Sequence, residues 1–137
     1  MKKLLTLFTI LLFAGTTSFY SCGGGKAANT PGETLKKSMS LLSDKKYDDV
    51  VAMYAKKDGT ALTDEEKKKM SGLMTLATGE LDKKQGVKSI DVLEEKIADD
   101  GKTATVKFKT TYGNGETNEE TNEMVNVDGK WFIVIGN

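Results

Sequence analysis

The sequence contains no histidine and no arginine, and among its 137 residues it has one cysteine and one proline. Without histidine, the protein lacks the side chain that most often serves as a catalytic base or metal ligand near neutral pH. Without arginine, it lacks the planar group that binds phosphates and bases through two hydrogen bonds. One cysteine excludes a disulfide within the chain. These absences count against metalloenzymes, nucleic-acid-binding proteins and disulfide-stabilised domains.

Length and composition indicate a single globular domain. The chain has 38% hydrophobic and 29% charged residues, and its 20 lysines balance 20 acidic residues. This composition excludes disordered and collagen-like proteins. The lysines recur in pairs between apolar stripes, which is typical of the solvated faces of helices. We therefore expect no nucleic-acid partner.

The chain starts with a segment typical of a signal peptide. Lys2 and Lys3 are followed by an uncharged apolar run from Leu4 to Gly15. Twelve helical residues span about 18 Å, well short of a hydrocarbon core of about 30 Å. The run therefore suits a signal-peptide core better than a membrane-spanning helix, and we assign residues 1–21 to the signal peptide.

The only cysteine stands directly after this segment, in Ser21-Cys22-Gly23. A cysteine between a small residue and glycine after a signal core resembles a bacterial lipoprotein signal. The resemblance implies that residues 1–21 are removed, that Cys22 carries acyl chains, and that residues 22–29 form a flexible tether to a membrane of the cell envelope, with the domain extracytoplasmic. A free cysteine near a cleavage site elsewhere is the alternative. The processed chain would have 18 Lys and 20 acids, a net charge of −2.

Three helices are predicted in the first half of the remaining domain, residues 30–137. Thr30-Pro31-Gly32-Glu33 and Thr63-Asp64-Glu65-Glu66 combine a hydroxyl N-cap with an acid three residues later, which marks helix starts. The apolar stripes are Leu35, Met39 and Leu42 in the first helix, Tyr47, Val50, Val51 and Tyr54 in the second, and Met70, Leu73, Met74, Ala77 and Leu81 in the third.

The second half has the alternating pattern of strands. Strands are predicted at 87–97, 103–112, 116–127 and 130–135, with turns at Asp99-Asp100-Gly101, Gly113-Asn114-Gly115 and Asp128-Gly129. We therefore expect an α+β domain in which three N-terminal helices pack on a curved four-stranded antiparallel sheet.

The hairpin turns leave two registers open. A three-residue loop at Gly113 to Gly115 places Phe108 opposite Glu120 and buries Met124, Trp131, Ile133 and Ile135 on the helix side. A two-residue loop would slip the register and bury Val125, Val127, Phe132 and Val134 instead. We favour the first register because it buries the larger side chains.

At this level the domain resembles small lipoproteins with a DUF4878-type domain. The residues that carry the resemblance are Pro31, Asp44-Lys45-Lys46-Tyr47, Thr103-Ala104-Thr105-Val106 and Asp128-Gly129-Lys130-Trp131-Phe132-Ile133. The resemblance implies an NTF2-like cone, in which a curved sheet wraps around helices. That fold hosts enzymes, ligand binders and scaffolds alike, so it leaves function open.

One candidate pocket emerges, on the inner face of the sheet. It would be lined by Phe108, Tyr112, Asn118, Glu120, Asn122 and Trp131, because polar groups bordered by aromatic rings are typical of small-molecule pockets. The alternative is that this end of the hairpin is solvated on both sides. Glu120 is the only acid expected to face inward, and one carboxylate without a second acid or base is weak support for acid–base catalysis.

Metal binding and catalysis are therefore not expected, and no cofactor is predicted. The acids of the third strand point to alternate faces, so they cannot converge on a calcium ion as its coordination requires; they are Glu116, Glu119, Glu120 and Glu123. The methionines Met39, Met53, Met70 and Met74 lie mostly on core stripes rather than in a metal site.

Three functional hypotheses follow. The leading one is a lipid-anchored envelope domain that binds a small hydrophobic ligand or an envelope protein without catalysis. The second is a structural or assembly protein that forms a homodimer or docks through its outer sheet face, although the outward row is polar: Thr103, Thr105, Lys107, Lys109 and Thr111. The third is an NTF2-like isomerase or hydrolase that uses Glu120.

Overall fold

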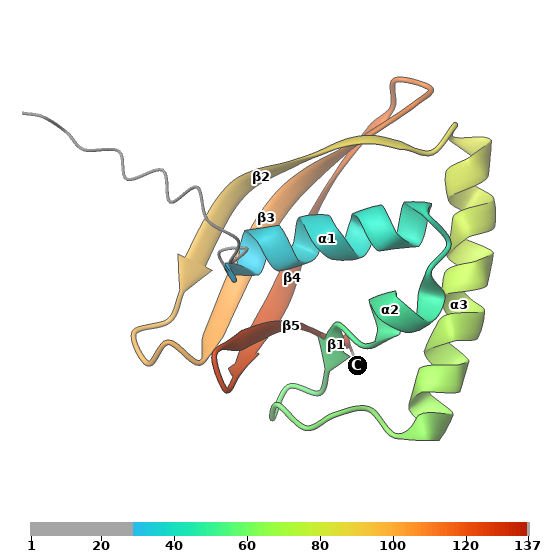
Figure 1. Cartoon of the computed structure of the whole chain (residues 1–137). Helices are drawn as coiled ribbons and strands as arrows, with labels where there is room; N and C mark the ends of the chain where they lie inside the picture. Colours follow the sequence, from blue (N-terminus) through green and yellow to red (C-terminus); the bar gives the residue numbers. More distant parts are fainter. Residues whose placement is uncertain (1–28, 137) are drawn as a thin grey trace, which may run out of the picture.

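The computed structural model describes residues 29–136, so residues 1–21 and Cys22 lie outside the described residues. The elements in chain order are α1 (Pro31–Ser43), α2 (Tyr47–Val51), β1 (Tyr54–Ala55), α3 (Asp64–Lys83), β2 (Val87–Ile97), β3 (Thr103–Tyr112), β4 (Thr117–Val127) and β5 (Lys130–Val134). The sheet curves behind α1, and α3 stands at one border of the molecule (Figure 1). The α+β class and the three helices are as predicted.

The first helix, α1, lies directly on the sheet. Thr30 caps it by accepting a hydrogen bond from the backbone N–H of Glu33, and proline occupies its first turn. Leu35, at 1% exposure, enters the main hydrophobic cluster formed with β3, β4 and β5. The start of α1 also touches β2, because the N–H of Gly32 donates to the Glu95 carboxylate at 2.7 Å. A Cβ at this position would lie 2.7 Å from this carboxylate and 3.1 Å from a Val92 methyl group, so both side chains would have to shift.

The long helix α3 begins at a capping box. The Thr63 hydroxyl accepts from the N–H of Glu66, and the Glu66 carboxylate accepts from the N–H of Thr63. Hydrogen bonds to the Glu66 carboxylate from the N–H of Thr63, from the Lys56 ammonium and from the Thr63 hydroxyl lower the pKa of Glu66 from 4.5 to about 2. The acid is therefore ionised over the physiological range, where its charge also suits the positive end of the helix dipole.

The buried face of α3 differs from the predicted stripe. The helix packs against α1 and α2 rather than against the strands. Met74 and Thr78 are its buried residues, and Thr78 exchanges a hydrogen bond with the Tyr47 hydroxyl at 2.8 Å. Leu73, predicted to be buried, is 65% exposed. A helical period of 3.6 residues predicts burial from apolar residues alone. Here the polar Thr78 is buried as well, because its hydroxyl is hydrogen-bonded.

The sheet has five strands and is mixed, so the prediction of four antiparallel strands was wrong. The strand order is β1-β5-β4-β3-β2, and β1 pairs with β5 in parallel through Tyr54↔Ile133 and Ala55↔Val134. The sequence predicts a helix at Tyr54, because this residue continues the spacing of the second apolar stripe. A strand of 2 residues is too short to have an alternating pattern of its own.

The register of the hairpins is the favoured one. Phe108 lies opposite Glu120, Ala104 opposite Met124, and Asn126 opposite Trp131. Gly113 to Gly115 form the three-residue loop, closed by a hydrogen bond from the N–H of Tyr112 to the carbonyl of Glu116. Asp128 and Gly129 both have positive φ, as the two-residue turn requires.

The core confirms this register. Met124, Trp131 and Ile133 are 1%, 7% and 2% exposed and pack with Leu35 and Phe108. A second cluster, centred on Val50, Val51, Leu62 and Met74, joins α2 to α3, and Tyr54 contacts both clusters. Val125, on the opposite sheet face, is nevertheless buried, since the loop at Gly59 packs over it.

We expect Gly113→Ala to destabilise the protein more than a loop substitution normally does. A Cβ built on Gly113 would overlap the backbone carbonyl of Gln85, which cannot rotate away. The cost should be about 1–3 kcal/mol of the free energy of unfolding, measured with urea. The matched control is Gly79→Ala in α3, where nothing lies within 4 Å of the new Cβ. That variant should be more stable by about 0.5–1 kcal/mol, and equal effects at both positions would contradict the close approach.

Candidate functional site

The six residues of the predicted pocket lie in three different places. Their role as a binding site stays a prediction. Phe108 and Trp131 belong to the main core cluster. Asn118 and Glu120 are exposed on the inner face of β4, and Asn122 is half-buried. Tyr112 is buried near the end of α3, where the Lys84 ammonium lies 4.5 Å from the centre of its ring.

The inner face of β4 does bring two of the polar residues together. The Asn118 amide donates to the Glu120 carboxylate at 2.8 Å. Glu120 pairs across the sheet with Phe108, which is 1% exposed, so the carboxylate stands at the border of the hydrophobic core. The structure therefore places one carboxylate and one amide next to a buried aromatic side chain, in the solvent-exposed first half of β4.

Tyr54 is a further member of this group that the sequence did not reveal. It is half-buried, and burial is the main cause that raises the pKa of its phenol above the ordinary value of 10.0. The negative charge of Glu120 raises this pKa further. The phenol therefore stays neutral at physiological pH and can donate a hydrogen bond. Only the pairing of β1 with β5 brings Tyr54 to this face, and a two-residue strand leaves no signal in the sequence.

A separate cavity lies at the edge of the sheet around Trp131. We call it the Trp131 hollow. It has a volume of about 560 Å³ and is lined by Asn29, Glu33, Thr34, Lys37, Ala52, Met53, Lys130, Trp131 and Phe132. These residues come from the start of α1, the segment between α2 and β1, and the start of β5. Sequence reasoning named Trp131, but it did not find the other lining residues.

The shape of the sheet explains why the hollow is there. β1 pairs only with Ile133 and Val134, so the first residues of β5 have no partner strand on that edge. The N–H of Ile133 donates to the Met53 carbonyl at 2.9 Å, and that of Ile135 donates to the Ala55 carbonyl at 3.1 Å. Since backbone donors alternate along a strand, the N–H of Trp131 points to the same edge, toward the hollow.

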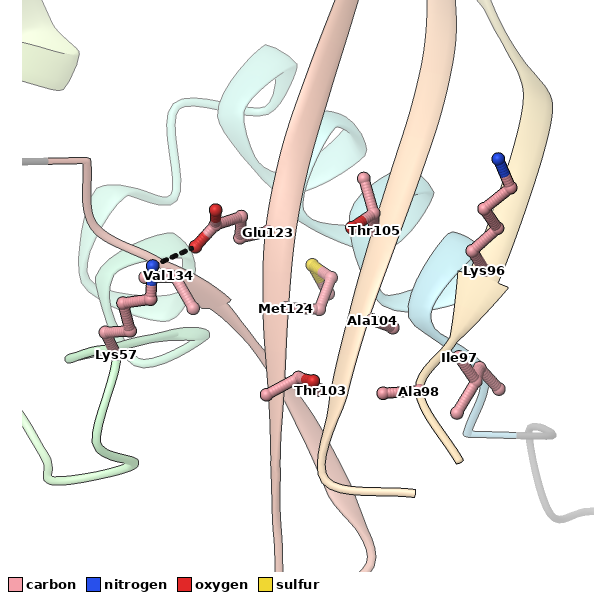
Figure 2. Close-up of a pocket in the computed structure, with 10 residues that line it drawn as sticks. All are labelled: Lys57, Lys96, Ile97, Ala98, Thr103, Ala104, Thr105, Glu123, Met124 and Val134. Atoms are coloured by element: carbon pink, nitrogen blue, oxygen red, sulfur yellow. Dashed lines mark ion pairs between the residues drawn. The ribbon is translucent and has the colours of Figure 1, made fainter. Parts of the chain in front are cut away.

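A second hollow lies on the outer face of the sheet (Figure 2). It has a volume of about 380 Å³ and is lined by Lys57, Lys96, Ile97, Ala98, Thr103, Ala104, Thr105, Glu123, Met124 and Val134. The Lys57 ammonium reaches the Glu123 carboxylate at 3.2 Å, and the two side chains are 77% and 58% exposed. An ion pair so well solvated contributes little to stability or to binding. Another outer-face pair, between Lys107 and Glu119, joins β3 to β4 at 3.1 Å.

The described residues contain neither a group of three ligating side chains suited to a metal ion nor a helix long and apolar enough to cross a membrane. These findings concern residues 29–136 alone.

Comparison with solved structures identifies the fold. The chain resembles a protein from Campylobacter jejuni assigned as an NTF2-like transpeptidase, with a TM-score of 0.64, 18% identity, and coverage of 77% of this chain and 98% of that one. It also resembles a SEC-C motif containing protein from Rhodopseudomonas palustris, with a TM-score of 0.58, 14% identity, and coverage of 82% and 80%. No protein-family model and no curated protein matches the sequence. At these identities the likeness concerns the fold alone, and the described domain has an NTF2-like fold.

We predict that Glu120→Gln lowers the pKa of Tyr54 without returning it to 10.0, because burial is the larger of the two causes. The measurement is tyrosinate absorbance against pH, taken as the difference from the same chain with Tyr54→Phe. The raised pKa also means that the stability contributed by neutral Tyr54 is present below about pH 10 and falls as the pH rises through the folded-state value. Glu123→Gln, on the opposite sheet face, is the control. An unchanged Tyr54 titration in Glu120→Gln would show that the carboxylate does not face the phenol.

Proposed function

We propose that this protein is a lipid-anchored domain of the bacterial cell envelope that binds a small amphipathic ligand in the Trp131 hollow without catalysis. The observation that carries the proposal is the hollow itself. Its volume of about 560 Å³ lies within the range of about 300–1,000 Å³ that is typical of ligand pockets. Met53, Trp131 and Phe132 give it an apolar wall.

The polar groups of the hollow favour a ligand with a carboxylate or a similar anionic end. Lys37 and Lys130 contribute two positive charges and Glu33 one negative charge. All three side chains are exposed, so they can reach a ligand without first losing a buried partner. The backbone N–H of Trp131 adds a donor on the sheet edge, where a carboxylate oxygen can accept it. The apolar wall would hold the hydrocarbon part of the same molecule.

The proposal includes no catalysis, because the residues that line the Trp131 hollow are poorly suited to it. The hollow offers one carboxylate, that of Glu33, and the chain has no histidine to act with it. A single exposed acid is a poor general acid or base at neutral pH. The Tyr54 and Glu120 pair on the inner face is the alternative place for chemistry, and the third hypothesis of an isomerase or hydrolase would rest on it.

The proposed anchor fits the position of the hollow. Asn29, the first described residue, donates a side-chain hydrogen bond to the Gly129 carbonyl and is itself part of the hollow's lining. A tether formed by residues 22–29 would therefore join the domain at a point next to the cavity. A membrane-bound Cys22 would keep the hollow close to the lipid surface, where amphipathic carboxylates are concentrated. That the domain is of the DUF4878 type, as the sequence resemblance implies, is part of the same proposal.

Decanoate is expected to bind to the protein and to change the fluorescence of Trp131, the only tryptophan in the chain. Decanol, with the same hydrocarbon part but no charge, should bind about tenfold more weakly, since it loses charge-assisted hydrogen bonds. Lys37→Glu combined with Lys130→Glu should reverse this preference, because the hollow would then carry three negative charges. Native mass spectrometry should show one decanoate per chain.

The matched control is Lys36→Glu combined with Lys102→Glu, two exposed lysines outside the hollow. This variant should keep the preference for decanoate. Equal binding of decanoate and decanol by the unmodified protein, or no fluorescence response to either, would reject the Trp131 hollow as a carboxylate site.

We also expect Cys22→Ala to move the protein from the membrane fraction to the soluble fraction or to leave its signal peptide uncleaved. Incorporation of labelled palmitate should be lost in the same variant. Ser18→Ala, a small change within the same segment, should behave like the unmodified chain. A Cys22→Ala protein that stays membrane-bound and is processed normally would show that the anchor is not a lipid on this cysteine.

A further inference from the structure

The outer side of α3 carries an apolar pair that the described domain does not cover. Leu73 is 65% exposed and Leu76 is 72% exposed, the highest values among the exposed large hydrophobic residues. The buried residues of the helix, Met74 and Thr78, lie on its other side, where it meets α1 and α2. Figure 1 shows α3 standing at the border of the molecule, with α1 and α2 to one side of it only.

The two leucines belong to a longer seam along the helix. Lys69, Leu73, Leu76 and Glu80 follow one another at spacings of four, three and four residues, the spacing of a coiled-coil contact line. At about 100° per residue, these four positions fall within about 60° of one another around the helix. All four are exposed in the described domain. The seam is therefore an apolar centre with a positive charge at one end and a negative charge at the other.

Two copies of the seam have complementary charges when the two helices run antiparallel. When two copies of α3 run antiparallel about a two-fold axis between Leu73 and Leu76, Leu73 faces the partner's Leu76. The same axis places Lys69 opposite the partner's Glu80, and it does so twice because the contact is symmetric. In a parallel pair, lysine would face lysine and glutamate would face glutamate. We infer that α3 forms a symmetric antiparallel pair with α3 of a second copy of this chain.

Neighbouring positions agree with this arrangement. Gly72 and Gly79 lie on one flank of the seam, and nothing lies within 4 Å of a Cβ built on either, so the helix axes can approach closely. Lys69 and Glu80 are at present paired only along their own helix, with Glu65 at 3.3 Å and with Lys83 at 2.6 Å. These pairs are exposed, and their charged groups can turn to a partner without leaving a buried charge behind.

The expected contact is small. α3 has 20 residues, which correspond to a length of about 30 Å, and only its central turns present the seam. Interfaces of this size fall below about 1,200 Å² and are typical of weak, reversible complexes. We therefore expect dimerisation that depends on concentration, and that would increase where chains are confined to a surface.

Charge reversal tests the antiparallel pairing directly. The full chain, as processed by the expressing bacterium and kept in a density-matched detergent, is studied by sedimentation velocity over a range of concentrations. Lys69→Glu alone and Glu80→Lys alone should each weaken dimerisation at least about tenfold, because each creates two like-charge contacts. The double variant with both changes should regain it. An equimolar mixture of the two single variants should also dimerise, since each then meets its complement.

Lys68→Glu is the matched control, because this exposed lysine lies on the same helix about 110° away from the seam. It should dimerise like the unmodified chain, whereas Leu73→Asp should be monomeric. A monomeric unmodified chain at every concentration would overturn the inference. So would dimerisation that survives Leu73→Asp, or single charge reversals that the double variant does not rescue. Circular dichroism of each variant separates loss of pairing from loss of the helix.

This inference does not depend on the proposed ligand. The seam and the Trp131 hollow share no residue, so ligand binding is expected to survive Leu73→Asp. Dimerisation is likewise expected to survive Lys37→Glu combined with Lys130→Glu, so either proposal can fail while the other stands.

Discussion

The close contact between the β3–β4 hairpin loop and the end of α3 ties the long helix to the sheet. The backbone reverses after α3 through Gln85 and Gly86, both with positive φ. The hairpin loop then bonds to this reversal, from the N–H of Gly113 to the Gly86 carbonyl at 3.0 Å and from the N–H of Asn114 to the Lys84 carbonyl at 3.1 Å. Lys84 reinforces the contact, because its ammonium also reaches the Glu116 carboxylate at 3.1 Å. Only glycine fits at position 113, since its backbone touches that of Gln85.

The same loop decides what the sheet buries. A loop of three residues puts Phe108, Met124, Trp131 and Ile133 on the face that receives α1. A slip of one residue would turn Trp131 outward and exchange it for Phe132 on the inner face, which would change the wall of the hollow. The ligand site proposed at the sheet edge therefore depends on a loop in a different part of the molecule. In the same way, the register places Glu120 opposite Phe108 on the inner face, from where its negative charge raises the pKa of Tyr54.

Much of the fold could be predicted from local patterns. Several elements are specified by nearby residues alone. They are the two helices capped by Thr30 and Thr63, the alternating strand from Ala104 to Tyr112 and the turn at Asp128-Gly129. What could not be predicted depends on contacts between distant segments. The pairing of Tyr54 with Ile133 joins residues far apart in the chain, and the burial of Thr78 needs the Tyr47 hydroxyl. The Trp131 hollow combines three separate segments, so its composition had no signature in the sequence.

The parallel pair of β1 and β5 has a consequence for the order in which the chain acquires its structure. β1 is formed by Tyr54 and Ala55, whereas its partner residues Ile133 and Val134 belong to a strand far along the chain. Local helices and the β2–β3 hairpin can form while the chain is still growing, because their contacts are short in sequence. The edge of the sheet at β1 closes only when β5 has reached it, and contacts between such distant segments cost more loop-closure entropy. Closing this edge is therefore a late step of folding, in which β5 enters the gap between β1 and β4.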